Sequence, residues 1–466
     1  MAQHEFDLVV IGSGPGGYVA AIRAAQLGMN VAVIERAEVG GVCLNWGCIP
    51  TKALLRSAEV FHLLQRHKEF GMLAENVSID FPAIIGRSRK VAMRLSKGVE
   101  FLFKKNNIIV ITGNAEFVSA HELTVKDDTG NVVETVNAKR VLIATGARPR
   151  ELPGVAFNGK TIITSKEAMS LETLPQTMII IGAGAIGVEF AYFYQSLGCQ
   201  VHLVEMMPSI LPIEDQEITK ILTTQFKKMK IKIYTDSRVQ SVESSADSVA
   251  VTVLQNDKEF TLEANVALVA IGVQGNSENL GLDRIGVNVE KSWIPVNANY
   301  QTSVESIFAI GDIIGPPWLA HVASSEGIVA VEKLAGLNPP AIDYKSIPGC
   351  TYCQPQVASI GLTEAKAIEN GFDITVGRFP FQANGKSLAL GESQGLVKLI
   401  FEKSSHQLLG AHIIHAEATE MINELSVVKN NNVDGHQLLK TIHAHPTLSE
   451  AIMEAAAAAY DEAIHI

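Results

Sequence analysis

The stretch that decides the fold reads FDLVVIGSGPGGYVA (residues 6–20), and a matching stretch, TMIIIGAGAIGVEFA, follows at residues 177–191. Each copy begins with an apolar run typical of a buried strand, continues with G-x-G-x-x-G and then has the pattern of a helix. An acidic residue, Glu35 or Glu205, follows the first glycine of each copy by 23 positions. The repeat therefore predicts two dinucleotide-binding βαβ units.

The glycines of the two loops have distinct roles in such a unit. The first permits a tight turn, the second lets backbone N–H groups approach a pyrophosphate, and the third lets the helix pack on the strand. They are Gly12, Gly14 and Gly17 in the first loop and Gly182, Gly184 and Gly187 in the second. One such motif is compatible with an incidental loop, and one acid with an ordinary surface carboxylate. Because both acids fall at the same offset, we expect Glu35 and Glu205 to accept hydrogen bonds from ribose hydroxyls.

Length and composition indicate a folded α/β enzyme of several domains. At 466 residues the chain exceeds what one hydrophobic core organises, so two to four domains are expected. It is 47% hydrophobic and 19% charged, which excludes a disordered chain. Its formal net charge of −11 disfavours binding to nucleic acid and to anionic membrane surfaces.

The sequence contains no candidate for a membrane span or a targeting segment. Its longest apolar runs, such as residues 266–273, are shorter than the roughly 20 residues that a bilayer requires. A strand is expected close to Met1, so we expect neither a secretory signal nor a transit peptide. A cytoplasmic protein is predicted, or one of the mitochondrial matrix if a transit peptide has been removed.

A pair of cysteines follows the first unit in GGVCLNWGCIPTK, residues 40–52. The chain has five cysteines, an odd number, which favours a reducing compartment and a reactive Cys43/Cys48 pair. In an ideal helix their Cα atoms would lie about 8.6 Å apart, whereas a disulfide needs less than about 7 Å. The pair can close only where the backbone leaves the helix, which Asn45 and Gly47 would tolerate. At the start of a helix such a disulfide is readily reduced to a thiolate. The alternatives to a redox-active pair are a buried structural disulfide or two free thiols in the core.

The other three cysteines indicate no site. Cys199 precedes a strand of the second unit and is expected in the core. Cys350 and Cys353 form C-x-x-C, but we expect both within one strand, where residues three apart point to opposite faces. No further Cys or His with zinc spacing accompanies them, so no metal site is predicted.

Near the other end, HAHPTLSE (residues 443–450) combines two histidines with a carboxylate. His445 stands before a proline, and Glu450 follows at the expected start of a helix. An imidazole oriented by a carboxylate is suited to general base catalysis, although a lone histidine is more often structural. The cysteine pair needs such a base, because only a thiolate attacks a disulfide.

The rest of the chain divides into further segments. A helix-rich stretch is expected over residues 51–103, followed by strands that end in VLIATGARP at 141–149. Strands near 266–272 and a further chain return at IFAIGD, residues 307–312, follow the second unit. From about residue 347 strands alternate with amphipathic helices without a nucleotide fingerprint, which predicts a terminal domain that faces a partner subunit.

With these motifs in order, the chain resembles the pyridine nucleotide-disulfide oxidoreductases along essentially its whole length. The motifs are GSGPGGYVAA, GGVCLNWGCIPTK, ATGARP, GAGAIGVE, FAIGD and HAHPTLSE. Within this family the chain is most similar to the enzymes that oxidise dihydrolipoyl groups. The resemblance implies an α/β fold with two Rossmann-like dinucleotide-binding domains and an α+β C-terminal dimerisation domain. The implied boundaries are 1–149 for the FAD-binding domain, 150–278 for the NAD-binding domain, 279–346 for the central domain and 347–466 for the interface domain.

The resemblance also implies the cofactor and catalytic sites, residue by residue. FAD would lie on Gly12 to Gly17, Glu35, Lys52, Ala115, Asp312 and Ala320, with Lys52 near the flavin N5 and paired with Glu189. NAD would lie on Gly182 to Gly187 and Glu205, with Val239 and Gly272 on the adenosine side. Cys43 would exchange with the substrate and Cys48 would contact the flavin. His445, positioned by Glu450 across a homodimer interface, would be the base.

The implied activity is oxidation of protein-bound dihydrolipoamide to lipoamide with reduction of NAD+. The implied partners are the lipoyl-bearing acyltransferase of a 2-oxo acid dehydrogenase complex or the carrier protein of glycine cleavage. Glutathione reductase is the alternative within the family, but Met206 and Met207 stand where NADP enzymes place arginines. Mercuric reductase would add a C-terminal cysteine pair, and soluble transhydrogenase would lack the redox cysteines. A flavoprotein kept only as a binding subunit would have lost a cysteine, the histidine or the glutamate.

One stretch departs from the family pattern. Where the family often has a stretch like T-x-P-E at the start of the interface domain, this chain has Tyr352, Cys353, Gln354, Pro355 and Gln356. The catalytic set is unaffected, so the departure bears on subunit or partner contacts of that strand.

Overall fold

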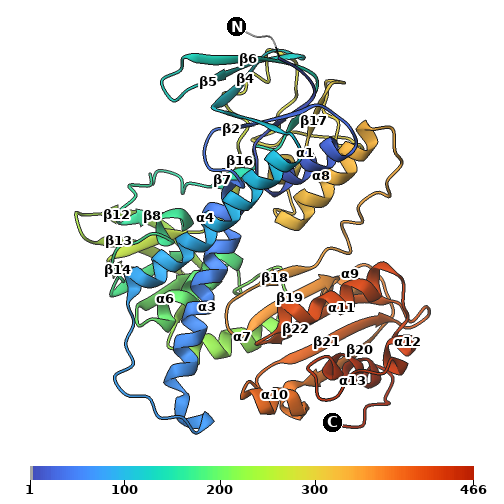
Figure 1. The fold of residues 1–466 in the computed structure, drawn as a ribbon. Helices are drawn as coiled ribbons and strands as arrows, with labels where there is room; N and C mark the ends of the chain where they lie inside the picture. Colours follow the sequence, from blue (N-terminus) through green and yellow to red (C-terminus); the bar gives the residue numbers. More distant parts are fainter. Residues whose placement is uncertain (1–3) are drawn as a thin grey trace. The chain divides into compact units, whose positions relative to one another are not determined.

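The computed structural model describes residues 4–466, which form two units, one with a mixed sheet and one with a parallel sheet (Figure 1). The first unit comprises residues up to 54, 82–150 and 272–342, and the second comprises 55–81, 151–271 and 343–466. The predicted fold class is confirmed, whereas the predicted four-domain boundaries stay a prediction. The expectation that no targeting segment precedes the first strand concerns residues 1–3, which lie outside the described part.

The sheet of the first unit has the order β3-β2-β1-β6-β5-β4, and β17 pairs with β6. Its strands are β1 (His4–Ile11), β2 (Val31–Glu35), β3 (Ile109–Thr112), β4 (Asn114–Ser119), β5 (Glu122–Lys126), β6 (Val132–Ile143) and β17 (Ile307–Ala309). Because β1 pairs in parallel with both β2 and β6, the topological switch point lies between β1 and β6. The IFAIGD segment returns to this sheet, since β17 runs parallel to the end of β6.

Helices bury one face of this sheet. They are α1 (Pro15–Gln26), α2 (Gly41–Trp46), α4 (Phe81–Lys105) and α8 (Ala320–Leu334), while α3 (Cys48–Gln65) begins in this unit. Leu8 and Val10 of β1 belong to a buried cluster with alanines of α1, whereas Val9 and Ile11 point into a second cluster on the other face. Burial of both faces explains why residues 8–11 of β1 and 31–34 of β2 are unbroken apolar runs.

The sheet of the second unit is parallel throughout, in the order β11-β10-β9-β15-β8. Its elements are β8 (Ile162–Ile163), β9 (Thr177–Ile181), α6 (Ala185–Ser196), β10 (Gln200–Val204), α7 (Gln216–Lys228), β11 (Lys232–Tyr234) and β15 (Val266–Val269). An antiparallel sheet of β12 (Ser237–Ser244), β13 (Val249–Gln255) and β14 (Lys258–Ala264) packs beside it. The strand, loop, helix and strand of the first unit therefore recur here, as the repeat predicts.

The terminal part of the second unit is an antiparallel sheet in the order β18-β19-β22-β21-β20. Its strands are β18 (Gly349–Thr351), β19 (Gln356–Gly361), β20 (Ile374–Pro380), β21 (Leu396–Glu402) and β22 (Leu408–His415). Its helices include α9 (Glu364–Glu369), α10 (Gly385–Leu390), α11 (Ala418–Asn430), α12 (Gly435–Lys440) and α13 (Glu450–Ala458). The helices α11 and α13 pack on the sheet and close its core.

The expectation that one strand holds both Cys350 and Cys353 is wrong. The strand β18 ends at Thr351, and Cys353 lies in the turn before β19. The physical reason is Pro355, which has no N–H to donate to a ladder and so favours a break between the two strands. Cys353 is buried and Cys350 half-buried.

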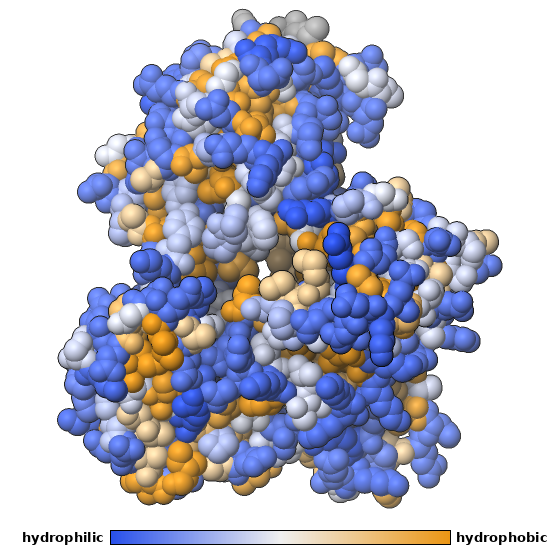
Figure 2. All heavy atoms as spheres, turned by 180° about the vertical axis from the view of Figure 1, so that it is seen from behind, coloured by the Kyte–Doolittle hydropathy of each residue, from blue (hydrophilic) through white to orange (hydrophobic). Residues whose placement is uncertain are grey.

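On the face shown in Figure 2, hydrophobic side chains gather in separate patches among hydrophilic ones. Within residues 4–466 no helix has both the length and the apolar character that crossing a membrane requires.

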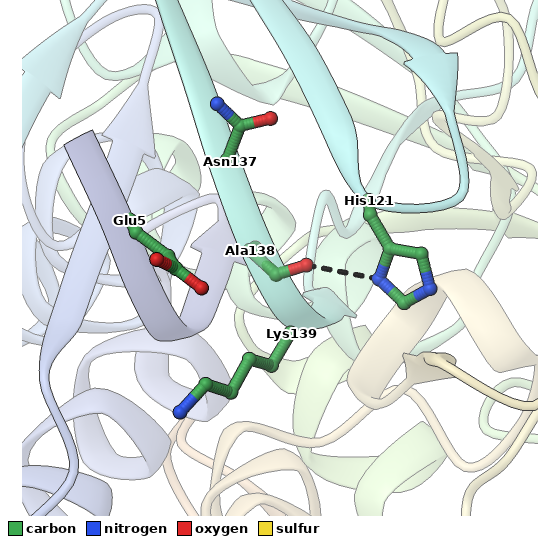
Figure 3. A pocket seen from close by; sticks show the side chains of 5 residues that line it. All are labelled: Glu5, His121, Asn137, Ala138 and Lys139. Carbon is green, nitrogen blue, oxygen red and sulfur yellow. Dashed lines mark hydrogen bonds between the residues drawn. The ribbon is translucent and has the colours of Figure 1, made fainter. Parts of the chain in front are cut away.

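A surface pocket lies at the amino end of β1 and is lined by Glu5, His121, Asn137, Ala138 and Lys139 (Figure 3). In it a ring nitrogen of His121 is 3.0 Å from the carbonyl oxygen of Ala138. Ligands of open α/β sheets bind beyond the carboxyl ends of the strands, and the glycine loop follows the carboxyl end of β1. This pocket is therefore at the wrong edge of the sheet for a nucleotide.

Candidate active site

The first glycine loop has the geometry of a pyrophosphate cradle. Gly12 has a φ of +98°, and a Cβ added to it would lie 2.4 Å from the carbonyl oxygen of Ala144. A Cβ on Gly17 would lie 2.0 Å from the carbonyl oxygen of Gly12, so α1 can approach β1 only because this residue is glycine. A Cβ on Gly14 meets no atom within 4 Å. The loop is therefore closely packed where it turns and open where a pyrophosphate would lie.

The second glycine loop repeats these distances. Gly182 has a φ of +101°, and its added Cβ would lie 2.4 Å from the carbonyl oxygen of Ala270. An added Cβ on Gly187 would lie 1.9 Å from the carbonyl oxygen of Gly182, whereas Gly184 is open. The two loops are far apart in the sequence but have the same geometry. Each fits a dinucleotide at the start of a helix.

The paired glycines give a matched test of this geometry. We expect Gly187→Ala to destabilise the second unit by roughly 4 kcal/mol, because the methyl group overlaps a backbone oxygen. Gly184→Ala should leave stability nearly unchanged, since its backbone is extended and the space is open, yet raise the KM for NAD+ severalfold. Thermal unfolding and steady-state kinetics measure the two effects. Equal stability of both variants would contradict the packing argument.

The acids of the two units hold the glycine loops in place. Glu35 Oε2 accepts hydrogen bonds from Ser13 N at 2.8 Å and Ser13 Oγ at 2.6 Å. Glu205 Oε2 accepts from Ala183 N at 2.6 Å, and its Oε1 accepts from Met207 N at 2.8 Å. Both carboxylates are buried; Glu35 is the last residue of β2, and Glu205 directly follows β10. Their predicted contact with ribose stays a prediction, and fixing the loop is a role that spacing alone did not indicate.

Ser13 is a residue that sequence reasoning missed. Besides contacting Glu35, its Oγ accepts a hydrogen bond from Gly40 N at 3.1 Å. An added Cβ on Gly41 would lie 2.7 Å from Gly14 Cα, so the cysteine segment lies directly against the glycine loop. The middle positions of G-x-G are unconstrained in the motif, so nothing in the sequence singles Ser13 out.

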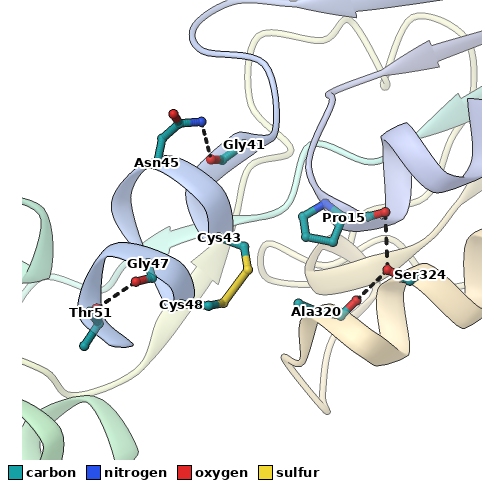
Figure 4. The surroundings of a disulfide bond; sticks show 9 residues. All are labelled: Pro15, Gly41, Cys43, Asn45, Gly47, Cys48, Thr51, Ala320 and Ser324. Atoms are coloured by element: carbon teal, nitrogen blue, oxygen red, sulfur yellow. Dashed lines mark hydrogen bonds between the residues drawn. A yellow bond between two sulfur atoms is a disulfide. The ribbon is translucent and has the colours of Figure 1, made fainter. Parts of the chain in front are cut away.

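The two cysteines form a disulfide where the helix is interrupted (Figure 4). Their Cα atoms are 4.8 Å apart, well below the distance in an ideal helix, as the sequence argument requires. The interruption falls at Gly47, between α2 and α3, and Cys48 is the first residue of α3. A Cβ on Gly47 would lie 3.0 Å from the carbonyl oxygen of Val42, so glycine permits the tight turn. The N-terminus of α3 favours a thiolate on Cys48.

Side chains of α4 contact the loop between the cysteines and hold it in place. The spacing of residues in the sequence did not indicate these contacts. Asn45 Nδ2 donates to the carbonyl oxygens of Val39 and Gly41, and its Oδ1 accepts from Ser96 Oγ at 2.8 Å. The guanidinium of Arg89 donates to the carbonyl of Asn45 and lies 4.0 Å from the centre of a ring of Trp46. The backbone around Cys43 is therefore preorganised.

The remaining FAD candidates lie in the first unit, which includes the start of α3 and therefore Lys52. Asp312 follows β17, and burial together with nearby Glu326 raises the pKa of Asp312 to about 6. Ala320 is the first residue of α8, whose Ser324 Oγ donates to the carbonyl oxygen of Pro15 at 3.4 Å (Figure 4). Ala115 is buried on β4, and Lys52 is half-buried on α3. A partly buried carboxyl and two adjacent helix N-termini suit a polyhydroxyl and pyrophosphate ligand such as FAD.

The partner predicted for Lys52 and the remaining NAD candidates lie on three different segments. Glu189 is buried on α6, and its Oε1 accepts from Tyr352 N at 2.9 Å. Its predicted pairing with Lys52 stays a prediction. Val239 is half-buried on β12, and Gly272 has a φ of +106° with open space at its Cβ position.

His445 and Glu450 meet at the beginning of α13. His445 Nδ1 lies 2.8 Å from Glu450 Oε1, and Glu450 Oε2 accepts from Thr447 N at 2.8 Å. Burial acts to raise the pKa of Glu450, but the hydrogen bonds from Thr447 and His445 outweigh it and hold the pKa below its ordinary value. The side chain of His445 is 79% exposed in this chain. The ionised carboxylate therefore orients an imidazole whose Nε2 is free to act on a substrate.

The remaining predictions concern Cys199 and metal binding. Cys199 is in the core, as predicted, and burial raises the pKa of its thiol to about 12. Among the residues that the structure describes, no three His, Cys, Asp or Glu side chains are arranged to hold a metal ion.

Comparisons with known proteins agree over the whole length. A family model described as pyridine nucleotide-disulphide oxidoreductase matches residues 6–327, and its dimerisation domain matches residues 347–456. Dihydrolipoyl dehydrogenase from Rhizobium etli is 50% identical, with 99% of each chain covered, and that from Zymomonas mobilis is 46% identical over both full lengths. The crystal structure of LpdA from Mycobacterium tuberculosis has a TM-score of 0.90 at 27% identity, covering 97% of this chain and 99% of that one.

Proposed function

Because the chain belongs to the pyridine nucleotide-disulphide oxidoreductases, we propose that it oxidises dihydrolipoyl groups on a carrier protein and reduces NAD+. The observation that carries the proposal is the Cys43–Cys48 disulfide, which lies at the start of α3 and against the glycine loop of the first unit. The cofactors are FAD and NAD, and the dimerisation domain makes the enzyme a homodimer.

The substrate reaction begins with proton removal. His445, oriented by Glu450, takes a proton from one substrate thiol, and the resulting thiolate attacks Cys43 Sγ. The bond between the two cysteines breaks, and Cys48 leaves as a thiolate stabilised by the N-terminus of α3. The second substrate thiol then loses its proton and attacks the substrate sulfur of the mixed disulfide. The bond from that sulfur to Cys43 Sγ breaks, Cys43 takes up the proton, and lipoamide is released. Two electrons have passed to the protein, which now has a thiol on Cys43, a thiolate on Cys48 and the first proton on His445.

FAD supplies the link to the nicotinamide, since a bound flavin accepts two electrons from a dithiol and passes a hydride to NAD+. The chain supports this chemistry by binding and orientation. FAD would be held by Gly12 to Gly17, Glu35, Lys52, Ala115, Asp312 and Ala320. NAD would be held by Gly182 to Gly187, Glu205, Val239 and Gly272, and Glu189 would pair with Lys52.

The preference for NAD+ over NADP+ follows from Glu205. A buried carboxylate at this position repels a 2′-phosphate, and the next residues, Met206 and Met207, are exposed and uncharged. We expect kcat/KM to favour NAD+ by about 100-fold or more. Glu205→Gln keeps one of the two oxygen acceptors that hold the loop and removes the negative charge. It should therefore reduce the ratio of kcat/KM for NAD+ to that for NADP+. A preference for NADP+ in the unchanged enzyme would favour the glutathione reductase alternative.

The partner of this reaction is a protein that carries a lipoyl group. We assign this role to the acyltransferase of a 2-oxo acid dehydrogenase complex or to the carrier protein of glycine cleavage. The direct experiment is NADH formation from free dihydrolipoamide, followed by the same assay with isolated lipoyl domains. No turnover of dihydrolipoamide, together with NADPH-dependent reduction of glutathione disulfide, would contradict the proposed function.

A further inference from the structure

We propose that His443 is a positioning residue of the dihydrolipoyl reaction: its ion pair with Glu424 fixes the segment 441–449, which carries His445. The inference rests on the proposed function. His443 is the first histidine of HAHPTLSE, and Glu424 lies on α11.

The segment 441–449 has little apolar packing within this chain. It joins α12 to α13 without helix or strand, and the side chains of Ile442 and His445 are 97% and 79% exposed. Downstream of His445, Leu448 packs against the core of the C-terminal antiparallel sheet. Upstream of His445, polar contacts within the chain therefore hold the backbone. The downstream side is also held by Thr447, whose N–H donates to Glu450 and whose carbonyl accepts from Asn384 Nδ2 at 3.0 Å.

The upstream side is held by His443. Its Nε2 lies 2.7 Å from Glu424 Oε1, its Nδ1 lies 2.9 Å from the carbonyl oxygen of Thr441, and its side chain is 7% exposed. Both partners accept hydrogen bonds, and a neutral imidazole donates only one. The geometry therefore requires the imidazolium form, in which each ring nitrogen donates. His443 and Glu450 thus fix the segment from opposite sides of His445.

This arrangement makes the position of His445 dependent on pH. The groups that face His443 are Glu424 of α11, the Thr441 carbonyl and, at longer range, Glu450 of α13. The hydrogen bond with Glu424 raises the pKa of His443 above its ordinary value, against the effect of burial. The paired hydrogen bonds of protonated His443 to Glu424 and to the Thr441 carbonyl are fully present below the ordinary histidine pKa of about 6.5. They are lost as the pH rises through the raised pKa of His443. Lipoyl turnover should therefore fall on the alkaline side.

The test is a pH profile of kcat for dihydrolipoamide oxidation by Glu424→Gln. Glu420→Gln is the matched control, because Glu420 lies one turn earlier on α11, is exposed and loses the same charge. We expect Glu424→Gln to lose about tenfold in kcat and to move the alkaline fall toward lower pH, since His443 then deprotonates sooner. His443→Gln should show the same loss, and the double variant should be no worse than either single one.

Dye reduction by NADH and FAD content are measured in every variant, because neither uses His445. Both should match the unchanged enzyme. Loss of either, or a lower kcat without a shift of the alkaline fall, would mean that the pair only supports the fold, and the proposal would be overturned. Profiles of Glu424→Gln that superimpose on the control would overturn it too. Absence of dihydrolipoamide turnover in the unchanged enzyme would instead refute the proposed function.

Discussion

Replacing Cys48 by serine is expected to abolish NADH formation from dihydrolipoamide while NADH still reduces an artificial dye through the flavin. The disulfide is the only cysteine pair bonded in residues 4–466, and without it the substrate thiolate has no sulfur bond to attack. The glycine loops and their acids are unaffected by the change, so both nucleotide sites should remain. The measurement compares lipoyl turnover with dye reduction at equal FAD content.

Cys199→Ala is the matched control for Cys48→Ser. It removes a thiol that is buried in the core of the second unit and forms no disulfide, so both activities should persist. If Cys48→Ser kept substantial lipoyl activity, electrons would reach the flavin by a route that does not use this disulfide.

Mixing two inactive variants is expected to restore activity. We propose that each active site combines Cys43 and Cys48 of one subunit with His445 and Glu450 of the other. A heterodimer of a Cys48→Ser subunit and a His445→Ala subunit would then have both lesions in one site and none in the other. With random assortment of equal amounts, half the dimers are mixed, and about a quarter of all sites should be intact.

The control for this experiment is a mixture in which one partner carries both substitutions. Its heterodimers with either single variant contain no intact site, so activity should stay absent. Heterodimer formation is verified with two different affinity tags before the assay. If verified heterodimers of the single variants have no activity, each site is built within one subunit.

Local chemistry in the sequence determined the nucleotide units and the redox centre. Glycine at Gly17 is required by its contact with the carbonyl oxygen of Gly12 in the same loop, and the spacing to Glu35 follows from the length of one helix and one strand. The ideal-helix distance excluded a regular helix between Cys43 and Cys48, and the structure interrupts the helix at Gly47. Such features depend on neighbours in the chain, so a sequence pattern reveals them.

Tertiary structure alone decided which distant groups share a contact. Several contacts join segments that no periodicity in the sequence relates. They are the pairing of β17 with β6, the hydrogen bond of Gly40 to Ser13, the contact of Arg89 with Trp46 and the ion pair of His443 with Glu424. The early end of β18 belongs here too, since the sequence indicated a longer strand. A single buried hydrogen bond or ion pair imposes no repeat on the sequence. It becomes visible only when the packed elements bring its two partners within about 3 Å.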